Sequence, residues 1–354
     1  MIYFLNELLF LCFMTSRIVP HHLQFKKPSG TSRGILVQKP SWFIVSQERG
    51  QIRSIGEVSV IEGLSPDLPA SVPGILHSFL SDQVPVPSRY PAIQFGIEMW
   101  QKSSQHDSPH QLYHSPWLEG QIGIPINGLI WMGPKDFMKE QIKQKIEAGF
   151  RCIKLKIGSL AFDEELDILK SIREEYTADD ITLRVDANGA FDPSDALEKL
   201  KRLSAYDIHS IEQPIKQNQW TEMAALCEAS TLPIALDEEL IGIESDEDRM
   251  SLLQHIQPHY IILKPSLLGG VVASESWIRI AESLDIGWWI TSALESNVGL
   301  NAIAQWTSTL DVDMPQGLGT GGLFKNNISS PLTIKKGHLW YDASLSWDYR
   351  ILMP

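Results

Sequence analysis

The stretch RCIKLKIGSLAFDEELDILKSIREEYTADDITLRVDANG, residues 151–189, decides the fold class. It opens with a short apolar run at 152–157, continues with a helical pattern at 162–176, and returns to an apolar run at 181–188. Strand, helix and strand in this order form the repeating unit of α/β proteins with a parallel sheet. The stretch therefore predicts an α/β fold.

The same alternation continues on both sides of this unit, from about residue 123 onward. Eight short apolar runs separated by helical patterns predict a (β/α)8 TIM barrel, although the eighth run is the weakest. A doubly wound sheet is the alternative, but no glycine-rich dinucleotide fingerprint follows an early strand. The predicted strands are 124–131, 152–157, 181–188, 208–214, 232–238, 259–265, 286–293 and 310–317. The predicted helices are 134–150, 162–176, 193–206, 219–230, 247–256, 270–285 and 295–309.

A different pattern precedes the barrel. Residues 34–47 and 52–62 alternate like strands around a turn signal at 48–51. Helical patterns follow within 69–115, and the clearest of them, 91–106, begins with a proline, which suits the first turn of a helix. This part of the chain is therefore predicted to be an α+β capping domain.

These patterns divide the chain into four predicted parts. The first part is either upstream sequence read in frame before a true start at Met14 or a disordered extension. The last part is expected to pack back on the capping domain. The four parts are 1–13, the capping domain 14–118, the barrel 119–325 and the C-terminal segment 326–354.

Composition narrows the function classes. The net charge of −13 argues against a general binder of nucleic acids or anionic membranes. Cys12, Cys152 and Cys227 lack both metal-ligand spacing and a disulfide framework, which favours a reducing compartment such as the cytoplasm. The net charge says little about a small-molecule carboxylate, which is the expected partner, because a local site can be basic within an acidic protein.

Charged and polar residues stand at the ends of five consecutive predicted strands. In a barrel these ends meet at one rim, where catalytic groups lie. Three converging carboxylates repel one another unless a cation joins them, and oxygen ligands without histidine or cysteine suit Mg²⁺, with Mn²⁺ as the alternative ion. The rim residues are Lys156, Asp186, Asn188, Glu212, Asp237, Glu238 and Lys264.

Lys154 and Lys156 lie two residues apart, so a strand directs both side chains to the same side. A neighbouring positive charge and partial burial both lower a lysine pKa, and a general base has to be neutral. This predicts that Lys154 tunes Lys156 as a base. A solvated strand face is the structural alternative for such a pair taken alone.

With these residues in place, the chain resembles the enolase superfamily, in its muconate-lactonizing-enzyme-like group. The resemblance covers nearly the whole chain after about residue 17, and it implies a lysine base and a Mg²⁺ ion that stabilises an ene-diolate. The matching residues are Lys154 and Lys156 of the K-x-K motif, Asp186, Glu212 and Asp237 as metal ligands, and Lys264 on the sixth strand.

Within that group, several stretches resemble the o-succinylbenzoate synthase family of menaquinone biosynthesis. The resemblance implies that Lys156 removes the proton α to the ring carboxylate of 2-succinyl-6-hydroxy-2,4-cyclohexadiene-1-carboxylate, and that syn loss of water yields o-succinylbenzoate. Lys264 would stabilise the anion, and Lys154 would assist Lys156 and contact the carboxylate. The similar stretches are 56–67, 91–100, 124–133, 263–270, 291–306 and 315–322.

Seven residues are candidates for supporting roles, and five of them have a structural alternative. Substrate-binding candidates are Ser292, which could instead cap a helix, Asn188, which could form a turn, and Arg33 in a mobile lid or plain hairpin loop at 27–34. The backbone N–H groups of two glycines could bind an anionic arm of the substrate or merely form a turn. The glycines are Gly317 and Gly319, and the candidate supports for the site are Glu238 and Glu295.

Two other functions compete with this interpretation. A dipeptide epimerase or N-acylamino-acid racemase would use Lys156 and Lys264 as opposing bases, and Asp311 and Asp313 faintly resemble an aspartate pair that holds a substrate ammonium. A barrel without catalytic function is the second competitor, but the intact set of lysines and carboxylates argues against it.

Overall fold

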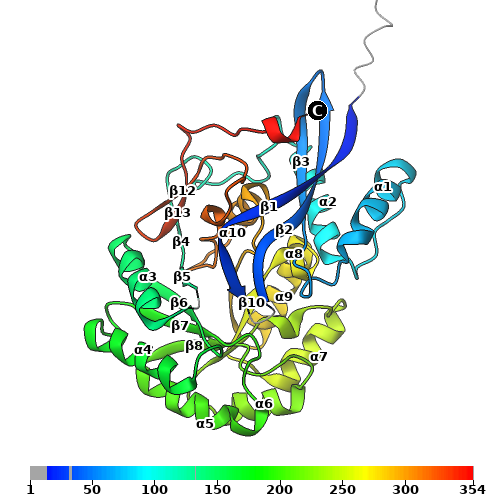
Figure 1. Cartoon of the computed structure of the whole chain (residues 1–354). Coiled ribbons are helices and arrows are strands. Elements are labelled where there is room, and N and C mark those ends of the chain that lie inside the picture. Colours follow the sequence, from blue (N-terminus) through cyan, green and yellow to red (C-terminus); the bar gives the residue numbers. More distant parts are fainter. Residues whose placement is uncertain (1–13, 32–33, 132, 354) are drawn as a thin grey trace, which may run out of the picture.

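The computed structural model describes residues 14–31, 34–131 and 133–353 (Figure 1). The predictions made for residues 1–13 and for Arg33 lie outside these ranges. Every helix within them is too short or too polar to serve as a membrane span.

The N-terminal part is an antiparallel sheet in the order β1–β2–β3. Arg49 and Gly50, with φ of 51° and 76°, form the turn between β2 and β3 where the sequence predicted it. The two predicted strands are confirmed, and β1 precedes them. The strands are β1 (Thr15–Thr31), β2 (Gly34–Glu48) and β3 (Gln51–Ser59).

Two helices, α1 (Val72–Asp82) and α2 (Pro91–Ser103), pack against one face of this sheet. Apolar residues of both layers meet in a core of their own. The approach of α2 to β3 requires glycine, because a Cβ on Gly56 would lie 2.0 Å from the carbonyl oxygen of Gly96. The predicted α+β arrangement is therefore present.

The central element is a parallel sheet of seven strands, which curls with helices along its outer side (Figure 1). Its strands follow one another in chain order, as repeated strand–helix units require. They are β5 (Gly128–Ile130), β6 (Cys152–Lys156), β7 (Thr182–Asp186), β8 (Ile208–Glu212), β9 (Ile234–Leu236), β10 (Tyr260–Leu263) and β11 (Gly287–Ile290).

The predicted eighth strand was mostly wrong. Residues 311–314 have no strand structure, and only Gln316 and Gly317 pair, through parallel bridges to Ile126 and Thr291. Hydrogen bonds from Gly317 N to the Ile290 carbonyl, 2.7 Å, and from Asn127 N to the Gln316 carbonyl, 2.9 Å, join this position to both sheet edges. A two-residue bridge thus occupies the eighth position of the barrel.

All seven helices predicted between the strands are present, with ends shifted by a few residues. The short helix α8 after β10 was not predicted, because four residues carry no periodic pattern. The helices are α3 (Lys135–Glu147), α4 (Phe162–Glu175), α5 (Pro193–Leu203), α6 (Trp220–Ala229), α7 (Asp246–Ile256), α8 (Pro265–Leu268), α9 (Val271–Ser283) and α10 (Asn297–Thr307).

The C-terminal segment contacts both larger parts. Its strands β12 (Leu332–Lys335) and β13 (His338–Tyr341) form a small sheet with β4 (Ile124–Pro125). The Arg17 guanidinium of β1 donates to the carbonyl of Leu352. The boundaries proposed at 118 and 325 stay predictions.

The C-terminal end of β1 and the N-terminal end of β2 extend over the barrel (Figure 1). Phe25 of β1 packs on Phe324 with ring centroids 4.8 Å apart. Leu36 of β2 and Leu294 pack against the same small cluster. The N-terminal sheet thereby covers the ends of the barrel strands.

Candidate active site

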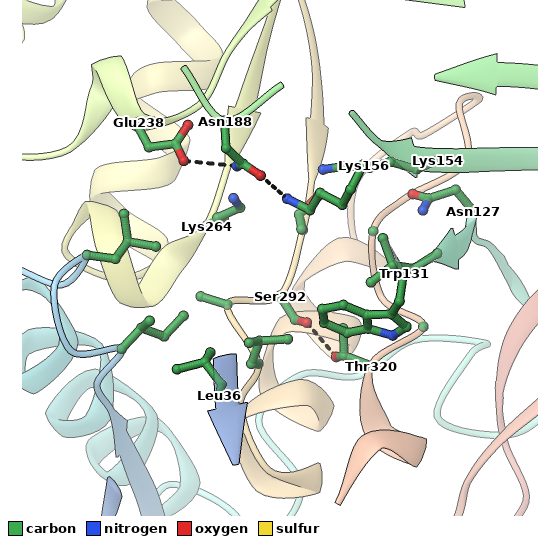
Figure 2. A pocket seen from close by; sticks show the side chains of 18 of the residues that line it. Leu36, Asn127, Trp131, Lys154, Lys156, Asn188, Glu238, Lys264, Ser292 and Thr320 are labelled. Atoms are coloured by element: carbon green, nitrogen blue, oxygen red, sulfur yellow. Dashed lines mark hydrogen bonds between the residues drawn. The ribbon is translucent and has the colours of Figure 1, made fainter. Parts of the chain in front are cut away.

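A cavity lies between the carboxyl ends of the barrel strands and the N-terminal sheet (Figure 2). Its barrel side carries polar groups, and its other side is apolar and includes residues from β2 and from the loop after β3. The polar lining includes Lys154, Lys156, Asn188, Glu238, Lys264 and Ser292, and the apolar lining includes Leu36, Ile61, Leu64, Leu129, Trp131 and Leu294. The structure thus brings eight of the predicted site residues to one cavity, since Gly317 and Gly319 line it as well.

Three carboxylates lie beside the lysines of this cavity on adjacent strands. Asp186 ends β7 and is in register with Glu212, which ends β8. Asp237 follows β9 directly, and the three side chains are at most 3% exposed. Parallel register therefore brings together carboxylates that are 26 and 25 residues apart in the chain.

Each carboxylate contacts a lysine. Asp186 Oδ2 lies 2.8 Å from Lys154 Nζ and 2.5 Å from Lys156 Nζ. Lys154 also donates to Glu212, and Lys264 donates to Asp237. The three adjacent carboxylates are therefore each paired with a lysine of the strands on either side of them.

These contacts set the charge states. Burial lowers the pKa of Lys154, but Asp186 and Glu212 more than offset it, so the net shift is upward. The pKa of Lys264 rises in the same way, since Asp237 and Glu212 outweigh burial. Burial raises the pKa of Asp186, yet Lys154 and Lys156 bring it well below its usual range. Burial and the charge of Asp186 raise the pKa of Glu212.

The carboxylates fit a divalent cation in their chemistry. Glu212 Oε1 is buried and has no hydrogen-bond donor among the described residues, and its neighbour Lys264 Nζ is 3.8 Å away. An orphaned carboxylate oxygen beside two further carboxylates is a set that Mg²⁺ prefers. In the described ranges, no three His, Cys, Asp or Glu side chains are grouped so that they could hold a metal ion as they stand. Each of the three carboxylates contacts a lysine instead. Asp186, Glu212 and Asp237 would hold the ion.

Lys156 belongs to a chain of three side chains (Figure 2). Its Nζ donates to Asn188 Oδ1 at 2.5 Å, and Asn188 Nδ2 donates to Glu238 Oε1 at 3.0 Å. Asn188 adopts φ of 44°, a left-handed conformation that asparagine tolerates better than most residues. Asn188 and Glu238 therefore orient Lys156, while the tuning of Lys156 by Lys154 stays a prediction.

Ser292 lies in the cavity wall, and its hydroxyl is 2.5 Å from the hydroxyl of Thr320. Ser296, rather than Ser292, caps α10 by accepting from Val298 N. The predicted anion-binding role of the Gly317 N–H was wrong, because this group donates to Ile290 within the barrel. Gly319 lines the cavity, and its N–H has no acceptor among the described residues.

Glu295 does not lie in the cavity wall, and its predicted support of the site is indirect. It is fully buried and accepts from the Ser266 hydroxyl at 2.5 Å. Ser266 lies in α8, two residues after Lys264. Glu295 therefore joins the loop after β11 to the segment that carries Lys264.

Several residues in or next to the cavity wall were missed by the sequence reasoning. Asn127 and Trp131 flank β5, so the strand-end rule applied to the first predicted strand would have found Trp131. Gln213, directly after Glu212, has φ of 40° and accepts from Asp237 N at 3.1 Å. Thr320 had no sequence signal, because its partner Ser292 is 28 residues away.

Comparisons with known proteins agree with this geometry. The family model described as "Enolase C-terminal domain-like" matches residues 137–343. The o-succinylbenzoate synthase of Desulfotalea psychrophila (strain LSv54 / DSM 12343) is 46% identical, over 90% of this chain and 96% of its own.

One solved structure and one more distant sequence relative add to this comparison. The crystal structure of MenC from Desulfotalea psychrophila LSv54 superposes with a TM-score of 0.82 and 42% identity, covering 92% of this chain and 99% of that one. The D-Ala-D/L-Ala epimerase of Cytophaga hutchinsonii is 32% identical, but over only 46% of this chain and 42% of its own. The chain therefore belongs to the enolase superfamily and, within it, to the o-succinylbenzoate synthase family.

Proposed function

We propose that this chain is an o-succinylbenzoate synthase, a carbon–oxygen lyase of menaquinone biosynthesis. The observation that carries the proposal is the relationship to the Desulfotalea synthase, which spans nearly the full length of both chains. Its substrate is 2-succinyl-6-hydroxy-2,4-cyclohexadiene-1-carboxylate, a small dicarboxylate. With buried thiols at Cys152 and Cys227 and no disulfide between them, we place the enzyme in the cytoplasm.

Lys156 is the base in this proposal. Its Nζ lines the cavity and is held by Asp186 and Asn188, which leaves the amine fixed relative to the substrate. As a neutral amine it takes the proton α to the ring carboxylate. As the resulting ammonium it returns that proton to the departing hydroxide, so one C–H and one C–O bond break and water leaves.

Lys264 stabilises the anion that forms between these two steps. Its ammonium is held by Asp237 and lines the same cavity as Lys156. Positive charge fixed in a site shielded from water lowers the free energy of a developing anion. Lys154, on the same face as Lys156, adds a second fixed positive charge.

We further propose that Mg²⁺, with Mn²⁺ as the alternative, binds Asp186, Glu212 and Asp237. When bound, the ion would supply positive charge to the substrate carboxylate as the α-proton leaves. The apolar side of the cavity, formed by Leu36, Leu64 and Leu129 among others, excludes water from the ring.

A spectrophotometric assay with freshly prepared substrate and Mg²⁺ tests this proposal by measuring the loss of the diene absorbance. We expect Lys156→Ala to lower kcat by about 10²- to 10⁴-fold, the usual contribution of a general base. Lys199→Ala is the matched control, because Lys199 lies on the outer helix α5 and pairs with Asp195. Absence of turnover by folded, metal-loaded wild type would overturn the proposal.

The epimerase alternative has weaker support. Asp311 and Asp313 are exposed and lie outside the cavity wall, so they cannot hold a substrate ammonium there. Lys156 and Lys264 both line the cavity, however, and such a pair can exchange a proton on either face of a carbon centre. Solvent deuterium incorporation into dipeptides and N-acylamino acids measures this activity directly.

A further inference from the structure

Three charged side chains are buried where the N-terminal sheet meets the barrel. Lys39 on β2, Glu57 on β3 and Glu295 after β11 are each at most 1% exposed. Charged groups are rarely buried to this degree without specific partners, because their desolvation is costly. None of the three lines the cavity, so the proposed chemistry does not explain them.

Glu57 caps the N-terminus of α10 from the other part of the molecule. Its carboxylate accepts from Ser296 N and Gly299 N, both at 2.9 Å, and from the Ser296 hydroxyl at 2.5 Å. Ser41 on β2 donates to the same carboxylate at 3.1 Å. Backbone N–H groups at a helix start are unpaired within the helix and favour an anion. The carboxylate thus joins β3 to α10.

The segment held in this way forms part of the cavity wall. Residues 291–296 connect β11 to α10, and Ser292 and Leu294 within them line the cavity. Leu294 has φ of 62°, a conformation that a leucine adopts only when its surroundings impose it. The contacts of Glu57 with Ser296 and Gly299 lie directly after this strained residue.

Lys39 and Glu295 are the other two buried charged residues at this interface. Lys39 donates to the Ser59 hydroxyl on β3, and its charge interacts with both Glu57 and Glu295. Burial lowers the pKa of Lys39, and the two carboxylates act in the opposite direction. The buried Lys39 side chain therefore interacts electrostatically with one carboxylate of the N-terminal sheet and one carboxylate of the barrel.

We propose that Glu57, supported by Lys39, is a positioning residue that holds residues 291–296 in the conformation in which Ser292 and Leu294 face the substrate. The N-terminal sheet thereby shapes the substrate side of the barrel through a buried carboxylate, besides covering it. The kinetic part of this inference rests on the proposed function, whereas the structural part does not.

The chain offers a matched control in Glu98. This residue of α2 accepts from Val271 N at 2.6 Å and from Val272 N at 3.1 Å, so it caps α9 as Glu57 caps α10. The residues it holds do not line the cavity. Glu57→Gln and Glu98→Gln each introduce an amide in place of a carboxylate that caps a barrel helix, but only Glu57→Gln acts on the cavity wall.

Amide hydrogen exchange tests the structural part without any substrate. We expect Glu57→Gln to speed exchange across 291–300 by about 10- to 100-fold, and Glu98→Gln to act only near 271–275. Unchanged exchange at 291–300 in Glu57→Gln would overturn the inference. If that variant does not fold, Ser296→Ala, which removes one donor to Glu57, is tested in its place with the same criterion.

Kinetics with the cyclohexadiene substrate test the positioning role. We expect Glu57→Gln to raise KM about tenfold or more, with a smaller change in kcat, because the base and the carboxylates are untouched. Glu98→Gln should leave KM within about twofold of wild type. Equal effects of the two variants on KM would overturn the positioning role. No turnover by wild type would instead count against the proposed function, while the exchange result still decides the structural part.

Discussion

Gly317 closes the barrel at a position where a side chain has no room. An ideal Cβ there would lie 2.2 Å from Thr291 Oγ1 and 2.8 Å from Thr291 Cβ and Cγ2. The bridge between Gly317 and Thr291 holds the two backbones together, so neither can withdraw without breaking it. Gly319, two residues on, would place a Cβ 3.4 Å from the Asn127 carbonyl oxygen, which is ordinary contact. The two glycines therefore predict opposite results for the same substitution.

The expected magnitude follows from these distances. Overpacking costs about 1–3 kcal/mol, and we expect the upper part of this range at Gly317 because Thr291 cannot move away. Replacing glycine by alanine also stabilises by about 0.4–1 kcal/mol through the unfolded chain. Gly317→Ala should therefore lower the free energy of unfolding by about 2 kcal/mol, or about 30-fold in the folding equilibrium. Gly319→Ala should be neutral or slightly stabilising.

Urea unfolding followed by tryptophan fluorescence measures this difference. Gly322→Ala is the control in the same segment, since a Cβ there meets no atom within 4 Å. We expect its urea midpoint to match that of Gly319→Ala and to exceed that of Gly317→Ala. Equal midpoints for all three variants would refute the argument that the eighth barrel position requires glycine.

Three further predictions concern the site and its surroundings. Asn188→Ala removes one of two groups that hold Lys156 Nζ, and kcat should fall by about 10- to 100-fold with little change in the unfolding midpoint. Because the ion binds the folded state, Mg²⁺ at a hundredfold excess over its Kd should raise the free energy of unfolding by about 2.7 kcal/mol and the unfolding midpoint with it. EDTA should reverse this increase. Burial lowers the pKa of His110 to about 4, so its imidazole stays neutral when folded but gains a proton near pH 6.5 when unfolded. Its contribution to stability is therefore complete above pH 6.5 and is lost as the pH falls toward 4, which urea midpoints measured across this range will show.

Each of these predictions has a control variant. Asn218→Ala replaces another asparagine with positive φ, 68°, away from the cavity wall, and should leave kcat unchanged. Asp186→Asn should abolish the Mg²⁺ shift, and a full shift in that variant would place the ion elsewhere. His110→Phe should reduce the decline of the urea midpoint between pH 6.5 and 4. A decline as steep as that of the wild type would mean that other groups cause it.

Much of the fold followed from periodicity. The strand and helix patterns after residue 123 predicted seven parallel strands and their helices correctly, because each unit carries its own local signal. The rim lysines and carboxylates followed from the same patterns, since parallel strands all end at one edge. The eighth strand failed because the closure at Gln316 and Gly317 depends on two distant neighbours, Ile126 and Thr291.

The supporting residues mark the limit of sequence reasoning. Glu295 was predicted to support the site, and the fold places it against Ser266, two residues after Lys264, and near Lys39 and Glu57 at the interface with the N-terminal sheet. Gly317 looked like an anion-binding glycine, and its N–H is instead used in the barrel. In both cases the partner lies far away in the chain, so no local pattern reports it.

The sequence by itself determined the α/β class, the order of the strand–helix units and the residue types at the rim, because these depend on periodicity and on spacing within one unit. Only the tertiary structure decided which groups touch. Three contacts join segments that become neighbours only after folding. They are the pairing of Lys156 with Asn188, the cover of Leu36 over the cavity and the capping of α10 by Glu57. Side-chain contacts of this kind depend on register and packing between elements, and those arise when the whole chain buries its apolar surface together.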